Sequence, residues 1–330
     1  MDLSKIQVRC LPETIRLGKV SDEVYFSSKY STYVSNSRLG LLDPNEDGSP
    51  EKFFKGTSSI CSDSLILGSA VHTMVLQPDL FELVRTRRPN AKLGYVCDYL
   101  FDHGDDQIEQ ASDALDYYKG KLTESRIKAV YDAYSLYKED RLAYTPNEKS
   151  PMFLSESMYD KAMKVISACQ NNEDFNKILT AGEYHENEQC FTLDFECTFP
   201  DHEPIIISWK SKLDNYTIDP LTNTIVVNDL KTIGSILSNF DYKNNGNMKK
   251  YHYTREFAIY TAILKSYALK EFGMTNPTMR ANALVVSTIP EYYTKVYKVT
   301  NGEVQIGFNE FKHLLKLVAY YKAYEGYDFV

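Results

Sequence analysis

The feature that most constrains the fold is a change in hydrophobic periodicity near residue 183. Before it, apolar residues recur at helical spacing, as in the segment Met158–Cys169. After it, the segments Ile205–Asp214 and Thr224–Lys231 alternate in hydrophobicity and are rich in β-branched residues. The turn-forming sequence Asp219–Asn223 separates them. The chain therefore has to place a strand, a turn and a strand beside helices, which predicts an α/β fold with a mixed sheet.

Three regions follow from this pattern. Residues 1–60 are polar and turn-rich, notably at Asp43–Pro50, and we expect an irregular N-terminal segment. Residues 61–182 form a mainly helical region, whose first helix is predicted around Leu67–Leu76 and stops before Pro78. Residues 183–330 form the α/β core and end in a C-terminal helix.

Further elements are expected within these regions. One helix of the middle region is predicted from the spacing of Ile108, Ala111, Ala114, Leu115 and Tyr118. In the core, a long helix covers Met248–Phe272 and is closed by Gly273. A strand pair follows at Arg280–Ile289 and Tyr292–Val299, and the last helix covers Phe308–Tyr324.

Charge and apolar runs exclude several classes of protein. The net charge is −8, so binding to nucleic acid has to come from a local basic surface. No run of about 18 apolar residues is present, and the N-terminus lacks the apolar core of a secretory signal, so we expect no membrane span and a cytoplasmic location in a bacterial or phage-infected cell. The six cysteines form no CxxC pair, which is typical of reduced thiols. No phosphate-binding loop of the Gly-x-x-x-x-Gly-Lys-Ser/Thr type occurs, so no nucleotide cofactor is expected.

Polar side chains interrupt the two alternating strands near their ends. Lys212 and Asp214 share one face of the first strand, and Asp229 and Lys231 point the same way from the second. If the strands pair, Asp214, Asp229 and Lys231 meet at one end of the sheet. Converging carboxylates suit a hard cation such as Mg²⁺ or Mn²⁺, and a lysine beside them can orient water or stabilise charge on a phosphate. For an isolated Asp-x-Lys motif, a surface ion pair is the commoner explanation.

The order of motifs along the chain is more specific than any one of them. It comprises Gly68–His72, Glu188, Lys212–Asp214, Val227–Thr232 and Tyr251–Tyr260, preceded by Val34–Leu39 and by Ser49-Pro50 with Phe53. This order resembles the PD-(D/E)xK nuclease superfamily, in its RecB-like and RecE-like (exonuclease VIII-type) branch known from phages and prophages. The resemblance covers about residues 34–85 and 183–325. It implies a mixed β-sheet flanked by helices, with a helical N-terminal or insert region.

The resemblance also implies roles for individual residues. Asp214 and Asp229 would hold metal, Lys231 would be the catalytic lysine, and His72 would lie beside the metal. The upstream acid would be Glu188, with Glu186 as the alternative. The remaining candidates, for contact with DNA, are Lys212, Lys250, Glu256 and Tyr260.

Some of these positions depart from the family or have plain structural alternatives. Glu256 stands four residues before Tyr260, where the family usually has glutamine. This changes the charge of the last motif and puts its usual DNA contact in question. His72 can also be a core histidine, and Tyr251, Tyr253 and Tyr260 can be packing aromatics rather than residues that stack on bases.

By resemblance, the expected activity is a deoxyribonuclease that uses one or two Mg²⁺ or Mn²⁺ ions, most simply a 5′-to-3′ exonuclease on double-stranded DNA ends. The branch also implies a homo-oligomeric ring and a single-strand annealing recombinase as partner. No cysteine follows Cys197, so the iron–sulfur cluster of some RecB-like nucleases cannot be built. Two alternatives stay open: a non-catalytic DNA- or protein-binding module of the same fold, and an endonuclease of that fold.

Overall fold

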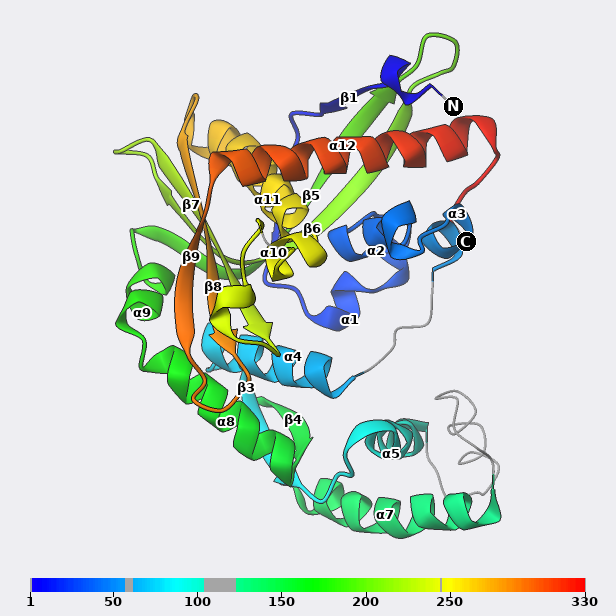
Figure 1. Ribbon diagram of the computed structural model, residues 1–330, viewed down its shortest axis with the longest axis vertical. Coiled ribbons are helices and arrows are strands. Elements are labelled where there is room, and N and C mark those ends of the chain that lie inside the picture. The colour runs from blue at the N-terminus through cyan, green and yellow to red at the C-terminus, as the bar shows by residue number, and fades with distance from the viewer. Residues whose placement is uncertain (1, 57–61, 104–122, 244, 330) are drawn as a thin grey trace.

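A computed structural model describes residues 2–56, 62–103, 123–243 and 245–329. Its centre is a seven-stranded mixed sheet in the order β1-β5-β6-β7-β8-β9, with β2 also paired to β5 (Figure 1). The strands β7 and β8 are parallel, and the other neighbours are antiparallel. Their bounds are β1 Gln7–Cys10, β2 Ile15–Gly18, β5 Tyr184–Thr198, β6 Ile205–Asp219, β7 Thr224–Ile233, β8 Thr278–Ser287 and β9 Thr294–Val299. The predicted α/β class and the mixed sheet are therefore confirmed.

Helices cover both faces of this sheet (Figure 1). On one face lie α11 (Tyr253–Phe272) and α12 (Asn301–Tyr324), packed on a core that includes Val227 of β7. On the other lie α4 (Asp63–Leu76), α8 (Glu156–Gln170) and α9 (Glu173–Leu179), around a second core that includes Leu230. Because β7 is buried on both faces, its few polar side chains need partners inside the protein.

A smaller unit stands apart from the central sheet (Figure 1). It contains two parallel strands, β3 (Phe81–Thr86) and β4 (Ser150–Ser155). Along the chain, β3 is followed by α5 (Ala91–His103), and α7 (Glu124–Ala143) precedes β4. The two helices share their own apolar cluster. The middle region is thus mainly helical, with one short two-stranded sheet. The helix predicted from Ile108 to Tyr118 lies outside the described residues.

The N-terminal segment differs from the irregular stretch expected at residues 1–60. It contributes β1 and β2 to the central sheet, and Val34 forms a β-bridge with the buried Trp209. The same segment also contains short helices and 3₁₀ turns: η1 Leu3–Lys5, α1 Asp22–Tyr25, η2 Ser28–Tyr30, α2 Asn36–Gly40, η3 Pro44–Glu46 and α3 Pro50–Lys55. Elements of three to six residues are too short to produce a readable hydrophobic period, which is why the sequence pattern missed them.

The elements expected after residue 240 are present with shifted boundaries. A short 3₁₀ turn η4 (Leu237–Asn239) precedes them. The helix predicted at Met248–Phe272 is broken into α10 (Asn247–Lys250) and α11, because His252 adopts a left-handed conformation with φ of 52°. Gly273 closes α11 with φ of 65°, as predicted. The strand pair β8–β9 is confirmed, and α12 begins earlier than predicted, behind a capping box of Thr300 and Glu303.

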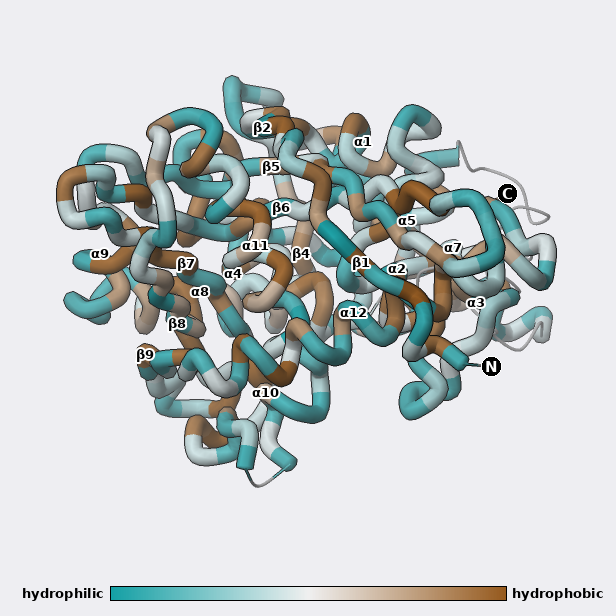
Figure 2. Tube along the Cα trace, turned by 90° about the horizontal axis from the view of Figure 1, so that it is seen from above, coloured by the Kyte–Doolittle hydropathy of each residue, from teal (hydrophilic) through white to brown (hydrophobic). Residues whose placement is uncertain are grey.

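Hydrophobic residues occur in short stretches along the chain rather than in one long run (Figure 2). Among the helices in the described part of the chain, none is long and apolar enough to cross a membrane.

Candidate active site

The site begins where β6 and β7 separate. Their antiparallel pairing runs from Asp219 opposite Thr224 to Asn215 opposite Asn228 and then stops. Beyond that point the Leu230 N–H donates to Oδ2 of Asp214 at 2.8 Å, while β7 continues to pair with β8. The Asp214 carboxylate therefore takes the place of a backbone acceptor at the fork between the two strands. This location fixes the side chain at the point where the two strands part.

Three potential metal ligands gather at this fork. One ligand atom each from His72, Glu188 and Asp214 lies within 4.8 Å of the others, and His72 Nδ1 is 3.4 Å from Asp214 Oδ2. His72 comes from α4, which packs on β7. A Cβ at Gly68 would lie only 3.1 Å from Thr232 Oγ1, so the glycine allows the close approach of this helix. The expected convergence of the α4 histidine on the strand carboxylates is present in the structure.

Glu188 reaches the cluster through an unusual backbone conformation. Its φ is 55°, in the left-handed region that residues other than glycine rarely adopt, and it interrupts the β5–β6 ladder between Asn187 and Gln189. The side chain is buried and lies 2.8 Å from Lys212 Nζ. Glu186 instead pairs with Arg16 at 2.7 Å. Of the two upstream glutamates, Glu188 is therefore the one that faces His72 and Asp214.

The second part of the site lies on the α11 side of β7. Lys231 Nζ is 2.5 Å from Asp229 Oδ2 and 2.7 Å from Glu256 Oε2. Tyr260, one helical turn after Glu256, donates to Glu256 Oε1 at 2.9 Å and to the Lys212 carbonyl at 3.1 Å. The last motif of the sequence thus acts inside the protein: Glu256 and Tyr260 hold Lys231 and the β6 backbone, and neither lines the cleft described below.

Charge and burial set the protonation of this second group. Burial alone would lower the pKa of Lys231, but Asp229 and Glu256 raise that pKa well above its usual value. Burial alone would raise the pKa of Glu256, but Lys231 and the Tyr260 hydroxyl hold it below its usual range. Lys231 is therefore a protonated lysine fixed by two acids. A glutamine at position 256 would be a weaker partner for this ammonium.

The cluster at the fork has the opposite electrostatic character. Burial, aided by Lys231, lowers the pKa of His72 to about 4, so its imidazole is neutral near pH 7. Burial and the nearby Glu188 raise the pKa of Asp214 to about 7. Asp229 adds a buried carboxylate oxygen, Oδ2, which contacts Lys231 and has no further hydrogen-bond partner among the described residues.

These properties test whether a divalent cation fits the residues at the fork. A neutral imidazole and close carboxylates are metal-ligand donors. Of the two carboxylates, Glu188 pairs with Lys212, whereas the pKa of Asp214 stays raised. Oxygen-rich donor sets of this kind suit Mg²⁺ or Mn²⁺. The residues present therefore fit the divalent cation that the resemblance of the sequence implies.

The fork opens into a cleft with a volume of about 1490 Å³. His72, Glu188, Lys212, Asp214 and Lys231 all line it, and the predicted contact residue Lys250 does so from α10. Sequence reasoning missed Lys19 and Asp22, which line the same cleft from the N-terminal segment. Asp22 lies 3.4 Å from Lys212 Nζ. No spacing signal could have found it, because α1 is only four residues long.

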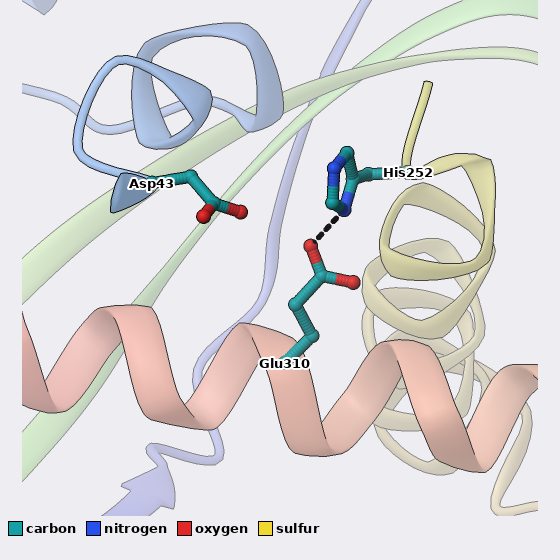
Figure 3. Close-up of side chains that lie close together, drawn as sticks. All are labelled: Asp43, His252 and Glu310. Atoms are coloured by element: carbon teal, nitrogen blue, oxygen red, sulfur yellow. Dashed lines mark ion pairs between the residues drawn. The ribbon is translucent and has the colours of Figure 1, made fainter. Parts of the chain in front are cut away.

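A second group of histidine and carboxylates lies elsewhere, between the N-terminal segment, α11 and α12. Asp43, His252 and Glu310 also bring one ligand atom each within 4.8 Å, and a His252 ring nitrogen contacts Glu310 (Figure 3). Here a cation is already present: the buried Arg255 guanidinium is 2.8 Å from Glu310 and 3.6 Å from Asp43. This group is therefore a satisfied ionic network within the fold.

This chain is similar to one protein family and to a solved structure. The model of a family described as a PDDEXK-like domain of unknown function (DUF3799) matches residues 55–325. A crystal structure named "Putative exonuclease", from Eubacterium rectale, aligns over 92% of this chain and 86% of its own, with 15% sequence identity and a TM-score of 0.49. Among proteins with curated descriptions, none is significantly similar to this chain.

Proposed function

Because this chain belongs to the family of PDDEXK-like domains, DUF3799, we propose that it is a metal-dependent deoxyribonuclease that hydrolyses phosphodiester bonds in the cleft. The observation that carries this proposal is the fork of β6 and β7. There His72, Glu188 and Asp214 lie within metal-binding reach of one another, and a fixed, protonated Lys231 lines the same cleft.

His72, Glu188, Asp214 and Asp229 would hold one or two Mg²⁺ or Mn²⁺ ions. When bound, such a cation offsets charge on the scissile phosphate and lowers the pKa of water. The chain's own residues supply the rest. His72 is neutral and offers a lone pair, and the Asp214 carboxyl would give up its proton to serve as a ligand.

Lys231 acts through its position. Asp229 and Glu256 hold its ammonium from two sides, so its remaining N–H group can donate to the attacking water or to a phosphate oxygen. Tyr260 in turn fixes Glu256. This arrangement keeps Lys231 charged and oriented before the substrate arrives, which is the condition for electrostatic stabilisation of the reaction.

The finer assignment rests on resemblance to the RecE-like branch. We propose double-stranded DNA ends as the substrate, 5′-to-3′ polarity, a homo-oligomeric ring and a single-strand annealing recombinase as partner. An endonuclease of the same fold and a non-catalytic binding module are the competing assignments.

One experiment separates these assignments. Purified protein is incubated with linear and with covalently closed circular DNA, in Mg²⁺, Mn²⁺ or EDTA. We expect loss of linear DNA alone, in the presence of metal only. Loss of both forms assigns an endonuclease, and loss of neither form favours the binding module. End-labelling of each strand then reports the polarity.

Two variants link any cleavage to this site. Lys231→Ala and Asp229→Asn should each abolish cleavage, with a far-ultraviolet circular dichroism spectrum like that of the wild type as evidence of folding. Full activity in a folded Lys231→Ala protein would overturn the proposed site.

A further inference from the structure

One aromatic side chain in the cleft has no evident structural purpose. Tyr251 is 49% exposed and lines the cleft near Lys231. Other exposed aromatic side chains occur among the described residues, namely Phe26, Tyr184, Tyr293 and Tyr324, but these do not line the cleft. The half-exposed ring of Tyr251 therefore offers a flat face to a ligand in the cleft.

The Tyr251 ring belongs to a short aromatic series that leads to the catalytic lysine. Its centroid lies 5.7 Å from that of Tyr253, and Tyr253 in turn stacks on Phe240 at 5.8 Å. Lys231 Nζ lies 4.6 Å from the centroid of the Tyr253 ring. Tyr251 is therefore the outermost ring of this series, one residue contact away from the group that would act on the phosphate.

A cation lies beside this ring, and the cleft has polar lining. Lys250 Nζ is 5.1 Å from the Tyr251 centroid, and Asn247, Asn239 and Ser235 line the same cleft. An aromatic face beside an ammonium and neutral hydrogen-bonding groups matches a nucleotide, which combines a flat base with a phosphate. An apolar ligand would leave Lys250 unpaired.

The backbone at this position is held firmly. Tyr251 is the C-terminal cap of α10, and the left-handed His252 is the N-terminal cap of α11. The His252 ring is fixed on one side by Glu310 (Figure 3). On the other side it lies 3.2 Å from Glu46. A ring presented on a fixed backbone loses little conformational freedom on binding.

We propose that Tyr251 stacks on the base of a terminal or unpaired nucleotide next to the scissile phosphate, while Lys250 contacts its backbone. This inference rests on the proposed nuclease function and adds a substrate feature to it. Bases inside a duplex are covered on both faces by their neighbours, so a free face is offered only at a strand end or in single-stranded DNA. The cleft would therefore hold an end whose last base is exposed.

The test uses short oligonucleotides with 2-aminopurine at the terminal position, whose fluorescence is quenched when an aromatic ring stacks on it. Binding is measured in EDTA, so that the readout does not depend on cleavage. We expect quenching with the wild type and with Tyr251→Phe, which keeps the ring. Tyr251→Ala should lose the quenching and bind about 5- to 150-fold more weakly.

Tyr324→Ala is the matched control. Tyr324 is 45% exposed and also contacts a neighbouring tyrosine ring, Tyr320, but lies outside the cleft. This variant should quench and bind as the wild type does. Equal loss in Tyr324→Ala and Tyr251→Ala, or unchanged quenching in Tyr251→Ala, overturns the stacking proposal.

The outcomes separate this proposal from the nuclease function. Metal-dependent cleavage by a wild type that shows no Tyr251-dependent quenching leaves the nuclease standing and overturns the stacking site. Quenching that depends on Tyr251, without any cleavage, supports the stacking site and contradicts the proposed nuclease function. A wild type that neither binds the oligonucleotide nor cleaves DNA with metal overturns both.

Discussion

Two clusters in this protein have the same ligand types but opposite electrostatics. His72, Glu188 and Asp214 lie at the fork of the central sheet, and Asp43, His252 and Glu310 lie between the N-terminal segment and α12. In the first cluster the pKa of the histidine is lowered to about 4, chiefly by burial. In the second the pKa of the histidine is raised, chiefly by its hydrogen bond to Glu310.

The difference has a structural cause. The second cluster contains Arg255, a buried cation that contacts both of its carboxylates. At the fork, the nearest lysines pair with Glu188, Asp229 and Glu256, and Asp214 keeps a pKa raised to about 7. The composition of a histidine–carboxylate group is therefore a poor guide to metal binding. The two clusters differ in whether a side chain of the protein already places a cation beside both carboxylates, as Arg255 does.

The largest effect should come from the same substitution made in each cluster. Asp214→Asn should lower the cleavage rate by about 10³- to 10⁴-fold, because the amide removes a charged metal ligand, while its oxygen can still accept from the Leu230 N–H. Asp43→Asn should lower it by less than about tenfold, as long as the protein is folded. Initial rates on linear DNA measure both, and equal losses in two folded variants would break the distinction between the clusters.

The second effect is on stability and should be confined to the Asp43 cluster. Arg255→Met removes a buried cation and leaves the carboxylates of Asp43 and Glu310 uncompensated. We expect the free energy of unfolding to fall by about 3 kcal/mol, the lower end for a broken buried ion pair, since Glu310 is partly exposed. Urea denaturation measures this change. A double variant, Arg255→Met with Asp43→Asn, should recover part of it.

The third effect is stabilisation by metal, which should depend on the fork alone. At a Mn²⁺ concentration about 100 times the dissociation constant, the free energy of unfolding should rise by about 2.7 kcal/mol. The rise should vanish in Asp214→Asn and persist in Asp43→Asn. A rise that persists in Asp214→Asn would mean that metal binds elsewhere.

Metal affinity at the fork should also depend on pH. Protons compete with the cation for Asp214, whose pKa is raised to about 7, so the affinity should weaken as the pH falls through about 7. Calorimetric titration in buffers of different ionisation enthalpy would count the proton released. An affinity that is constant from pH 6 to pH 8 would contradict this assignment.

The smallest effect concerns the pH dependence of stability at His252. Its pKa is raised in the folded protein, so its contribution is fully present below about pH 6.5, the ordinary histidine pKa. The contribution is lost as the pH rises through the raised value. The difference in unfolding free energy between wild type and His252→Gln should therefore be larger near pH 6 than at about pH 8.5. A difference that grows with pH would contradict this sign.

Much of the sheet and one face of the site were predictable from short-range pattern. Alternation located β6 and β7 and placed Asp229 and Lys231 on one side of the strand, where both contact the α11 side of the site. The glycine and small residues before His72 predicted a helix that packs closely. The N-terminal strands and Asp22 were missed, since their segments are too short to carry a period.

The sequence by itself determined the strand–turn–strand pattern, the helices around it and the set of acidic, lysine and histidine residues that resembles a nuclease. These follow from local periodicity and composition, which can be read from a few neighbouring residues. Only the tertiary structure decided which charges meet. The left-handed turn at Glu188 brought it, and not Glu186, to His72 and Asp214. The separation of β6 from β7 placed Asp214 at the fork, and α11 brought Glu256 to Lys231. Contacts of this kind join segments far apart in the chain, and burial then sets their protonation, which no local pattern encodes.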